Sequence, residues 1–167
     1  MAKKTDFTAQ DWETLRDAPH LVMLSVATAG ASGPIGSLKE AFAPAGAIIE
    51  AAKGNSELLR SICDREELKA AQQSLRSSLK MGGDLKALRE QLQTLAADKA
   101  RDANAILKRK GSTEDLDAYR KLLVDIADRT AKAAKEGGFL GFGGEWVSEG
   151  ERAVISRISQ ALEVQPS

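Results

Sequence analysis

The sequence predicts an all-α protein, a single-domain bundle of six to eight helices with a pseudo-duplicated core. Aromatic residues make up only 4% of the 167 residues, while Ala, Leu, Lys, Glu and Arg are abundant, as is typical of helical proteins. Apolar residues recur at three- and four-residue spacing, and no segment alternates as a strand would. Helix start and stop signals stand where this pattern is interrupted. We expect residues 1–167 to form one domain.

The first helices are expected to form the apolar core. Thr8 followed by Asp11 has the pattern of an N-cap with an acidic first turn. Pro19 suits the first turn of a helix, so a second helix is predicted over residues 20–29. This segment, with the core LVMLSVA, is apolar on nearly every side and is therefore the expected central buried helix. Residues 19–54 are predicted to hold the apolar core helices.

Two capping boxes suggest that the core is duplicated. Ser37 with Glu40 and Ser148 with Glu151 each place a serine three residues before a glutamate. In such a box each side chain accepts a hydrogen bond from a backbone amide at the helix start. Each box follows an apolar helix, a glycine-containing loop and an aliphatic residue. This recurrence predicts two related halves.

The middle of the chain predicts a long helical hairpin over residues 56–110. Gly82 and Gly83 mark a tight turn, and Asp84 is the expected N-cap of the helix that follows. Because the turn is short, the two helices are expected to lie antiparallel. Residues 113–163 then predict a helix pair joined by the sequence GGFLGFGG.

Composition and charge limit the function classes. The 24 basic and 24 acidic residues cancel, so no strong net field would attract nucleic acid or anionic lipid. The single cysteine, Cys63, excludes an intramolecular disulfide and indicates a reducing compartment. No apolar run is long enough to span a bilayer, and the N-terminal residues do not resemble a signal peptide. We expect a cytoplasmic protein with no transmembrane segment and no nucleic-acid partner.

The second capping box lies in VSEGERAVISRI, residues 147–158, and this stretch resembles the TerB-like family of tellurite-resistance proteins. LVMLSVATA followed by IGSLKEAF matches the first copy of the family pattern more loosely. The resemblance implies an all-helical bundle of related halves and a role in bacterial stress response. The acidic loop residue of the family pattern is missing here, because Ser32 precedes Gly33 in the first loop and the second loop is expanded. This departure puts metal binding by analogy with the family in doubt.

Four carboxylates are the candidate metal ligands. Glu40 and Glu151 could form a pair that holds a divalent cation or exchanges a proton, with Glu145 and Glu149 adding oxygens. The alternative, which we favour, is that Glu40 and Glu151 serve only as capping-box residues. No His or Cys accompanies them, so zinc is not expected. No other cofactor is predicted.

Three further features have a functional and a structural interpretation. His20 lacks a nucleophile motif beside it, and we expect it near the surface at a helix start. Arg60 and Arg65 could lower the pKa of Cys63, but a half-buried structural thiol is the preferred interpretation. The basic run over residues 108–110 is expected to complement the dipole at a helix C-terminus rather than to bind nucleic acid.

The glycine- and phenylalanine-rich loop is the preferred candidate site. Phe139, Leu140, Phe142 and Trp146 could form a lid, dock a partner, or plug the end of the bundle. The leading hypothesis is a non-catalytic, TerB-like cytoplasmic protein that binds a protein partner or a small ligand. The alternative is a helical bundle that binds an apolar small molecule or lipid in an interhelical cavity under the loop over residues 137–146. An enzyme using the paired glutamates is the least favoured hypothesis.

Overall fold

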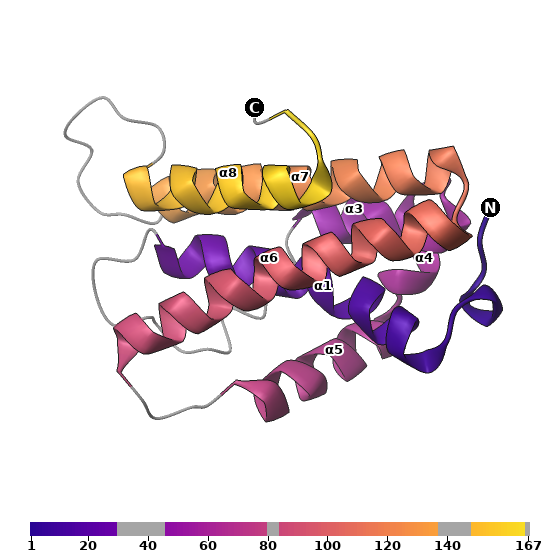
Figure 1. Ribbon diagram of the computed structural model, residues 1–167, viewed down its shortest axis with the longest axis horizontal. Helices are drawn as coiled ribbons and strands as arrows, with labels where there is room; N and C mark the ends of the chain where they lie inside the picture. The colour runs from indigo at the N-terminus through magenta and orange to yellow at the C-terminus, as the bar shows by residue number, and fades with distance from the viewer. Residues whose placement is uncertain (30–45, 80–83, 137–147, 166–167) are drawn as a thin grey trace.

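The computed structural model describes residues 1–29, 46–79, 84–136 and 148–165, and its elements confirm the predicted all-α bundle (Figure 1). Within these ranges the chain forms one short 3-10 helix and seven α-helices, and no strand. The elements are η1 (Lys4–Asp6), α1 (Ala9–Ala29), α3 (Gly46–Lys53), α4 (Glu57–Ile62), α5 (Arg65–Ser78), α6 (Leu85–Lys110), α7 (Thr113–Glu136) and α8 (Glu149–Leu162).

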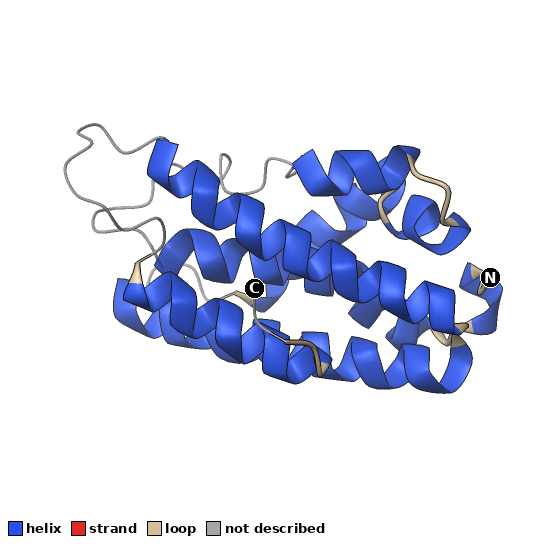
Figure 2. Cartoon of the chain, turned by 90° about the horizontal axis from the view of Figure 1, so that it is seen from above, coloured by secondary structure: helices blue, strands red, loops and turns tan. Residues whose placement is uncertain are grey.

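Helix α1 is the centre of the bundle. It contacts α5, α6, α7 and α8, and in Figure 1 it lies between α5 on one side and α7 and α8 on the other. Figure 2 shows the same helical bundle from above. Leu15, Ala18, Val22 and Val26 of α1 are completely buried. The prediction of a central apolar helix is therefore confirmed, because only a helix enclosed by neighbours can bury side chains on all sides.

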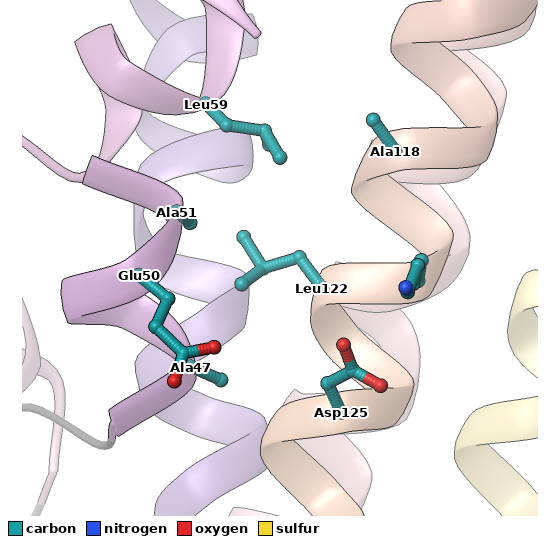
Figure 3. Close-up of a pocket in the computed structure, with 8 residues that line it drawn as sticks. Ala47, Glu50, Ala51, Leu59, Ala118, Leu122 and Asp125 are labelled. Atoms are coloured by element: carbon teal, nitrogen blue, oxygen red, sulfur yellow. The ribbon is translucent and has the colours of Figure 1, made fainter. Parts of the chain in front are cut away.

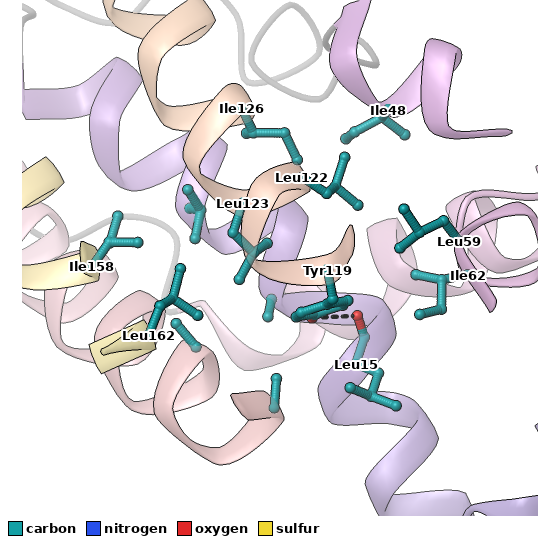
Figure 4. Close-up of a cluster of buried hydrophobic side chains, with 14 of the residues drawn as sticks. Leu15, Ile48, Leu59, Ile62, Tyr119, Leu122, Leu123, Ile126, Ile158 and Leu162 are labelled. Atoms are coloured by element: carbon teal, nitrogen blue, oxygen red, sulfur yellow. Dashed lines mark hydrogen bonds between the residues drawn. The ribbon is translucent and has the colours of Figure 1, made fainter. Parts of the chain in front are cut away.

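The predicted helix start at Pro19 is wrong, because α1 runs without interruption from Ala9 to Ala29. Proline has no N–H, so the carbonyl of Leu15, four residues earlier, loses its usual helical donor. The hydroxyl of Tyr119 in α7 donates a hydrogen bond of 2.8 Å to this carbonyl instead (Figure 4). A side chain from a distant helix thus replaces the bond that Pro19 removes.

Residues 56–110 contain α4, α5 and α6. Asp64 separates α4 from α5 by accepting hydrogen bonds from the amides of Glu66 and Glu67, as an N-cap does. Helices α5 and α6 both pack against α1, and a small apolar cluster joins the three elements; its buried members are Leu21, Leu24, Leu75, Leu79, Leu92 and Ala96. The glycine turn lies outside the described residues, whereas Asp84 caps α6 as predicted.

Helices α7 and α8 form the predicted C-terminal pair and contact each other. Ser148 and Glu151 form the predicted capping box at the start of α8. A Cβ atom added to Gly150 would lie 3.1 Å from the carbonyl oxygen of Ala29, so this end of α8 approaches the end of α1 closely. The other box, over residues 37–40, lies outside the described residues, and the duplication therefore stays a prediction.

Candidate functional site

One candidate site in the described part of the chain is an open groove between α3, α4 and α7, with a volume of about 190 Å³ (Figure 3). Its floor is apolar and its rim carries three charged side chains. The lining residues are Ala47, Glu50, Ala51, Leu59, Ala118, Lys121, Leu122 and Asp125. We call this hollow the α3–α7 groove.

Short side chains create the α3–α7 groove. Ala47 and Ala51 are four residues apart and therefore lie on one face of α3. They face Ala118 and Leu122 of α7, while Leu59 of α4 lies at one end (Figure 3). Because three of these five residues are alanines, they cannot fill the space between the two helices as larger side chains do elsewhere in the core.

The rim of the groove carries three charged side chains, of which one, the carboxylate of Glu50, is hydrogen-bonded to an arginine. The guanidinium of Arg129 donates to both carboxylate oxygens of Glu50, over 2.9 and 2.8 Å. These bonds lower the pKa of Glu50 from its ordinary value. Lys121 and Asp125 make no hydrogen bond, and no ion pair within 4.0 Å, to any other residue that the structure describes. Asp125 does interact electrostatically with Arg129 at longer range. The rim therefore offers one ammonium and one carboxylate to a ligand.

A second hollow, of about 270 Å³, lies between the N-terminal part of α1 and the C-terminal part of α6. Polar side chains dominate its lining, which includes Gln10, Thr14 and Arg109. Asp11 also lines this hollow, and its carboxylate already forms an ion pair of 2.7 Å with Lys110. Because this hollow lacks a substantial apolar floor, it is a poorer candidate for a small-molecule site than the α3–α7 groove.

The loop residues predicted as the ligand or partner site lie outside the described residues. These residues are Phe139, Leu140, Phe142 and Trp146, and the same holds for two of the candidate metal ligands, Glu40 and Glu145. Their proposed roles therefore stay predictions.

The two remaining candidate metal ligands, Glu149 and Glu151, differ in solvent exposure. Glu149 is exposed in the first turn of α8, whereas Glu151 is buried. One oxygen of Glu151 accepts the backbone N–H and the hydroxyl of Ser148, each over 2.8 Å. This is the capping role that we favoured. Within the described ranges, no group of three or more His, Cys, Asp or Glu residues could hold a metal ion.

His20 lies in the interior, which corrects the prediction of a surface position. Only 2% of its surface is exposed, because α1 continues through Pro19 and is enclosed by its neighbours. Burial, together with the charge of Arg16, lowers the pKa of His20 to about 4. Its Nδ1 atom has no hydrogen-bond partner among the described residues. The imidazole is therefore neutral and inaccessible near neutral pH.

Cys63 is more deeply buried than predicted, with 3% of its surface exposed. Burial raises the pKa of its thiol to about 12, since a thiolate would lose its hydration. The two nearby arginines do not overcome this effect. The interpretation of Cys63 as a structural thiol is supported, although the predicted half-buried position is wrong.

The basic run at residues 108–110 ends α6, as predicted. Lys108 pairs with Glu163 just after α8, and Lys110 pairs with Asp11 near the start of α1. These ion pairs connect the end of α6 to two other elements. The run therefore has a structural role in addition to complementing the helix dipole.

Comparisons of the chain with protein-family models, with curated proteins and with solved structures find no match. In the described part of the chain, none of the helices combines the length and the apolar character needed to cross a bilayer.

Proposed function

We propose that the protein is a non-catalytic binding protein whose ligand occupies the α3–α7 groove. The observation that carries this proposal is the combination of an apolar floor with charged groups at the rim. Small-molecule sites commonly have this composition, in which apolar residues supply most of the contact and a few polar groups fix the orientation. The groove is smaller than the pocket of a drug-sized ligand, so it suits a compact one.

The state of the reactive side chains supports a non-catalytic role. His20 and Cys63 are buried, and their shifted pKa values favour the neutral forms. Glu151 is engaged with Ser148 at the start of α8. General acid–base or nucleophilic catalysis requires groups that reach a substrate. These three side chains are accounted for by packing and capping.

The TerB-like family assignment and a role in bacterial stress response are part of the proposal. They rest on the sequence VSEGERAVISRI and are supported by the intact capping box of α8. A cytoplasmic location is proposed from the single cysteine, which cannot form an intramolecular disulfide. The alternative, an apolar ligand under the loop over residues 137–146, concerns residues outside those described and stays a prediction.

A fragment titration followed by amide NMR tests whether the groove binds ligands. The probes are small aliphatic and aromatic compounds, both neutral and charged. We expect shift changes to concentrate at Ala47, Ala51 and Leu122, and to disappear when Ala118→Leu fills the groove. Ala87→Leu, the same change at an exposed position of α6, is the matched control. Absence of shifts at the groove, or equal shifts in the Ala118→Leu variant, would overturn the proposal.

A further inference from the structure

We propose that the ligand of the α3–α7 groove is a small zwitterion with an aliphatic body, namely an α-amino acid with an aliphatic side chain. This inference rests on the proposed function and names its ligand class. Three properties of the groove support it: its limited length, its aliphatic floor, and the opposite charges that α7 places on its rim.

The groove is too short for a docked helix. Leu59 of α4 lies at one end and Glu50 of α3 lies near the other (Figure 3). The ion pair between Glu50 and Arg129 joins α3 to α7 there. An amphipathic helix binds through several anchors spread over successive turns. A hollow of about 190 Å³ bounded in this way has room for one compact molecule. The occupant that fits is therefore a small ligand.

The floor selects an aliphatic body. Methyl groups of Ala47, Ala51 and Ala118 and the side chain of Leu122 face the hollow (Figure 3). Transfer of a branched aliphatic group from water to this surface is favourable in proportion to the apolar area that is covered. No aromatic ring of the described residues lines the groove, so stacking with a planar ligand is not available there.

The rim selects a ligand that carries both charges. Arg129 already satisfies Glu50 with two parallel hydrogen bonds, which leaves Lys121 and Asp125 as the groups able to pair with a ligand. These two residues are four apart on α7, about 6 Å along the helix axis. An α-amino acid holds its carboxylate and ammonium on one carbon, so they can face Lys121 and Asp125 together. A ligand with a single charge would compensate only one rim residue.

Three probes with similar aliphatic bodies test the ligand class by amide NMR titration of the full chain. L-leucine carries both charges, 4-methylpentanoate only the carboxylate, and 3-methylbutylamine only the ammonium. We expect L-leucine to bind about fivefold more tightly than either singly charged probe, as expected for one additional exposed ion pair. All three probes should perturb the same groove amides, and Ala118→Leu should abolish these shifts.

Single charge-neutralising variants provide a crossed control. Lys121→Gln should weaken L-leucine and 4-methylpentanoate by about fivefold but leave 3-methylbutylamine unchanged. Asp125→Asn should weaken L-leucine and 3-methylbutylamine but not the carboxylate probe. Lys86→Gln and Asp102→Asn make the same changes at exposed positions of α6 and should have no effect. Far-ultraviolet circular dichroism confirms that each variant is folded.

The outcomes separate the ligand class from the proposed function. Equal affinity for the three probes, or variants without the crossed pattern, would overturn the zwitterion while leaving binding at the groove intact. The same conclusion follows if other fragments bind in the groove and L-leucine does not. If no compound of any class perturbs the groove, both the ligand class and the proposed function are wrong.

Discussion

Replacing Tyr119 with Phe tests how α1 continues through Pro19. The Tyr119 side chain is completely buried, and its hydroxyl donates the 2.8 Å bond to the carbonyl of Leu15. The variant retains the ring but leaves this carbonyl without a donor in the core, since Pro19 cannot supply one. A buried acceptor that loses its partner costs about 1–3 kcal/mol. We therefore expect the free energy of unfolding to fall by about 2 kcal/mol.

Urea denaturation followed by far-ultraviolet circular dichroism measures this loss. With a slope of about 2 kcal/mol per molar urea, the midpoint should fall by about 1 M. The slope itself should not change, because a missing hydroxyl does not alter the surface exposed on unfolding. If Tyr119→Phe costs less than about 0.5 kcal/mol, the hydroxyl does not support α1 in the way that we describe.

A double-mutant cycle with Pro19→Ala isolates the cause. Alanine restores an N–H that can donate to the Leu15 carbonyl within the helix. In this background, removal of the Tyr119 hydroxyl no longer leaves the carbonyl unsatisfied, so its cost should fall to less than half. The same cost in both backgrounds would refute the reasoning, because the hydroxyl would then act independently of the proline.

Two further predictions concern local features. The pKa of His20 is about 4 in the folded protein but about 6.5 in the unfolded chain. Between these pH values the unfolded state therefore binds more protons than the folded state. We expect the contribution of His20 to lower the free energy of unfolding by up to about 3 kcal/mol as the pH is lowered from 6.5 to 4. Urea titrations across this range should show a smaller loss for His20→Gln, and an identical loss would exclude His20 as the source. Ser148→Ala should lower the free energy of unfolding by about 1 kcal/mol, because it removes the N-cap of α8. Ser156→Ala, at a half-buried position of the same helix, is the control and should have little effect in the same urea titration. Equal losses in the two variants would mean that the cap does not contribute to stability.

Helix starts could be predicted from the sequence because capping is local chemistry. Ser56, Asp64, Asp84 and Ser148 each accept a hydrogen bond from an amide two or three residues later. Both partners lie within one turn, so the information is contained in a short stretch of sequence. The all-α class follows from the same local signals and from helical periodicity.

The predictions for Pro19 and His20 are wrong because residues far away in the sequence determine the surroundings of both side chains. Pro19 looks like a helix start, but Tyr119, which is 104 positions from Leu15, supplies the missing donor. The burial of His20 follows from the same continuity, because the helix around it is enclosed by four others. The sequence around residue 19 contains no signal for the hydrogen bond from Tyr119 or for the enclosure of α1 by its neighbours.

The α3–α7 groove was missed for a different reason. Ala47, Ala51 and Ala118 carry no functional signal in the sequence, since alanine has the highest helix propensity and is abundant in this chain. A hollow arises only when several small side chains from different helices face one another. The only available signal was the pair of alanines four residues apart on α3, and that spacing also occurs in helices that pack closely.

The placement of the groove separates stability from the proposed binding. Helix α3 has only eight residues and buries just Ala47 and Ile48, and the Glu50–Arg129 pair that joins it to α7 is exposed. Exposed ion pairs contribute at most about 1 kcal/mol, so α3 is held far more weakly than the enclosed α1. A ligand in the groove would add contacts between α3 and α7. The groove can therefore accommodate a ligand without changes to the core around α1, which the Tyr119–Leu15 bond and the buried side chains hold in place.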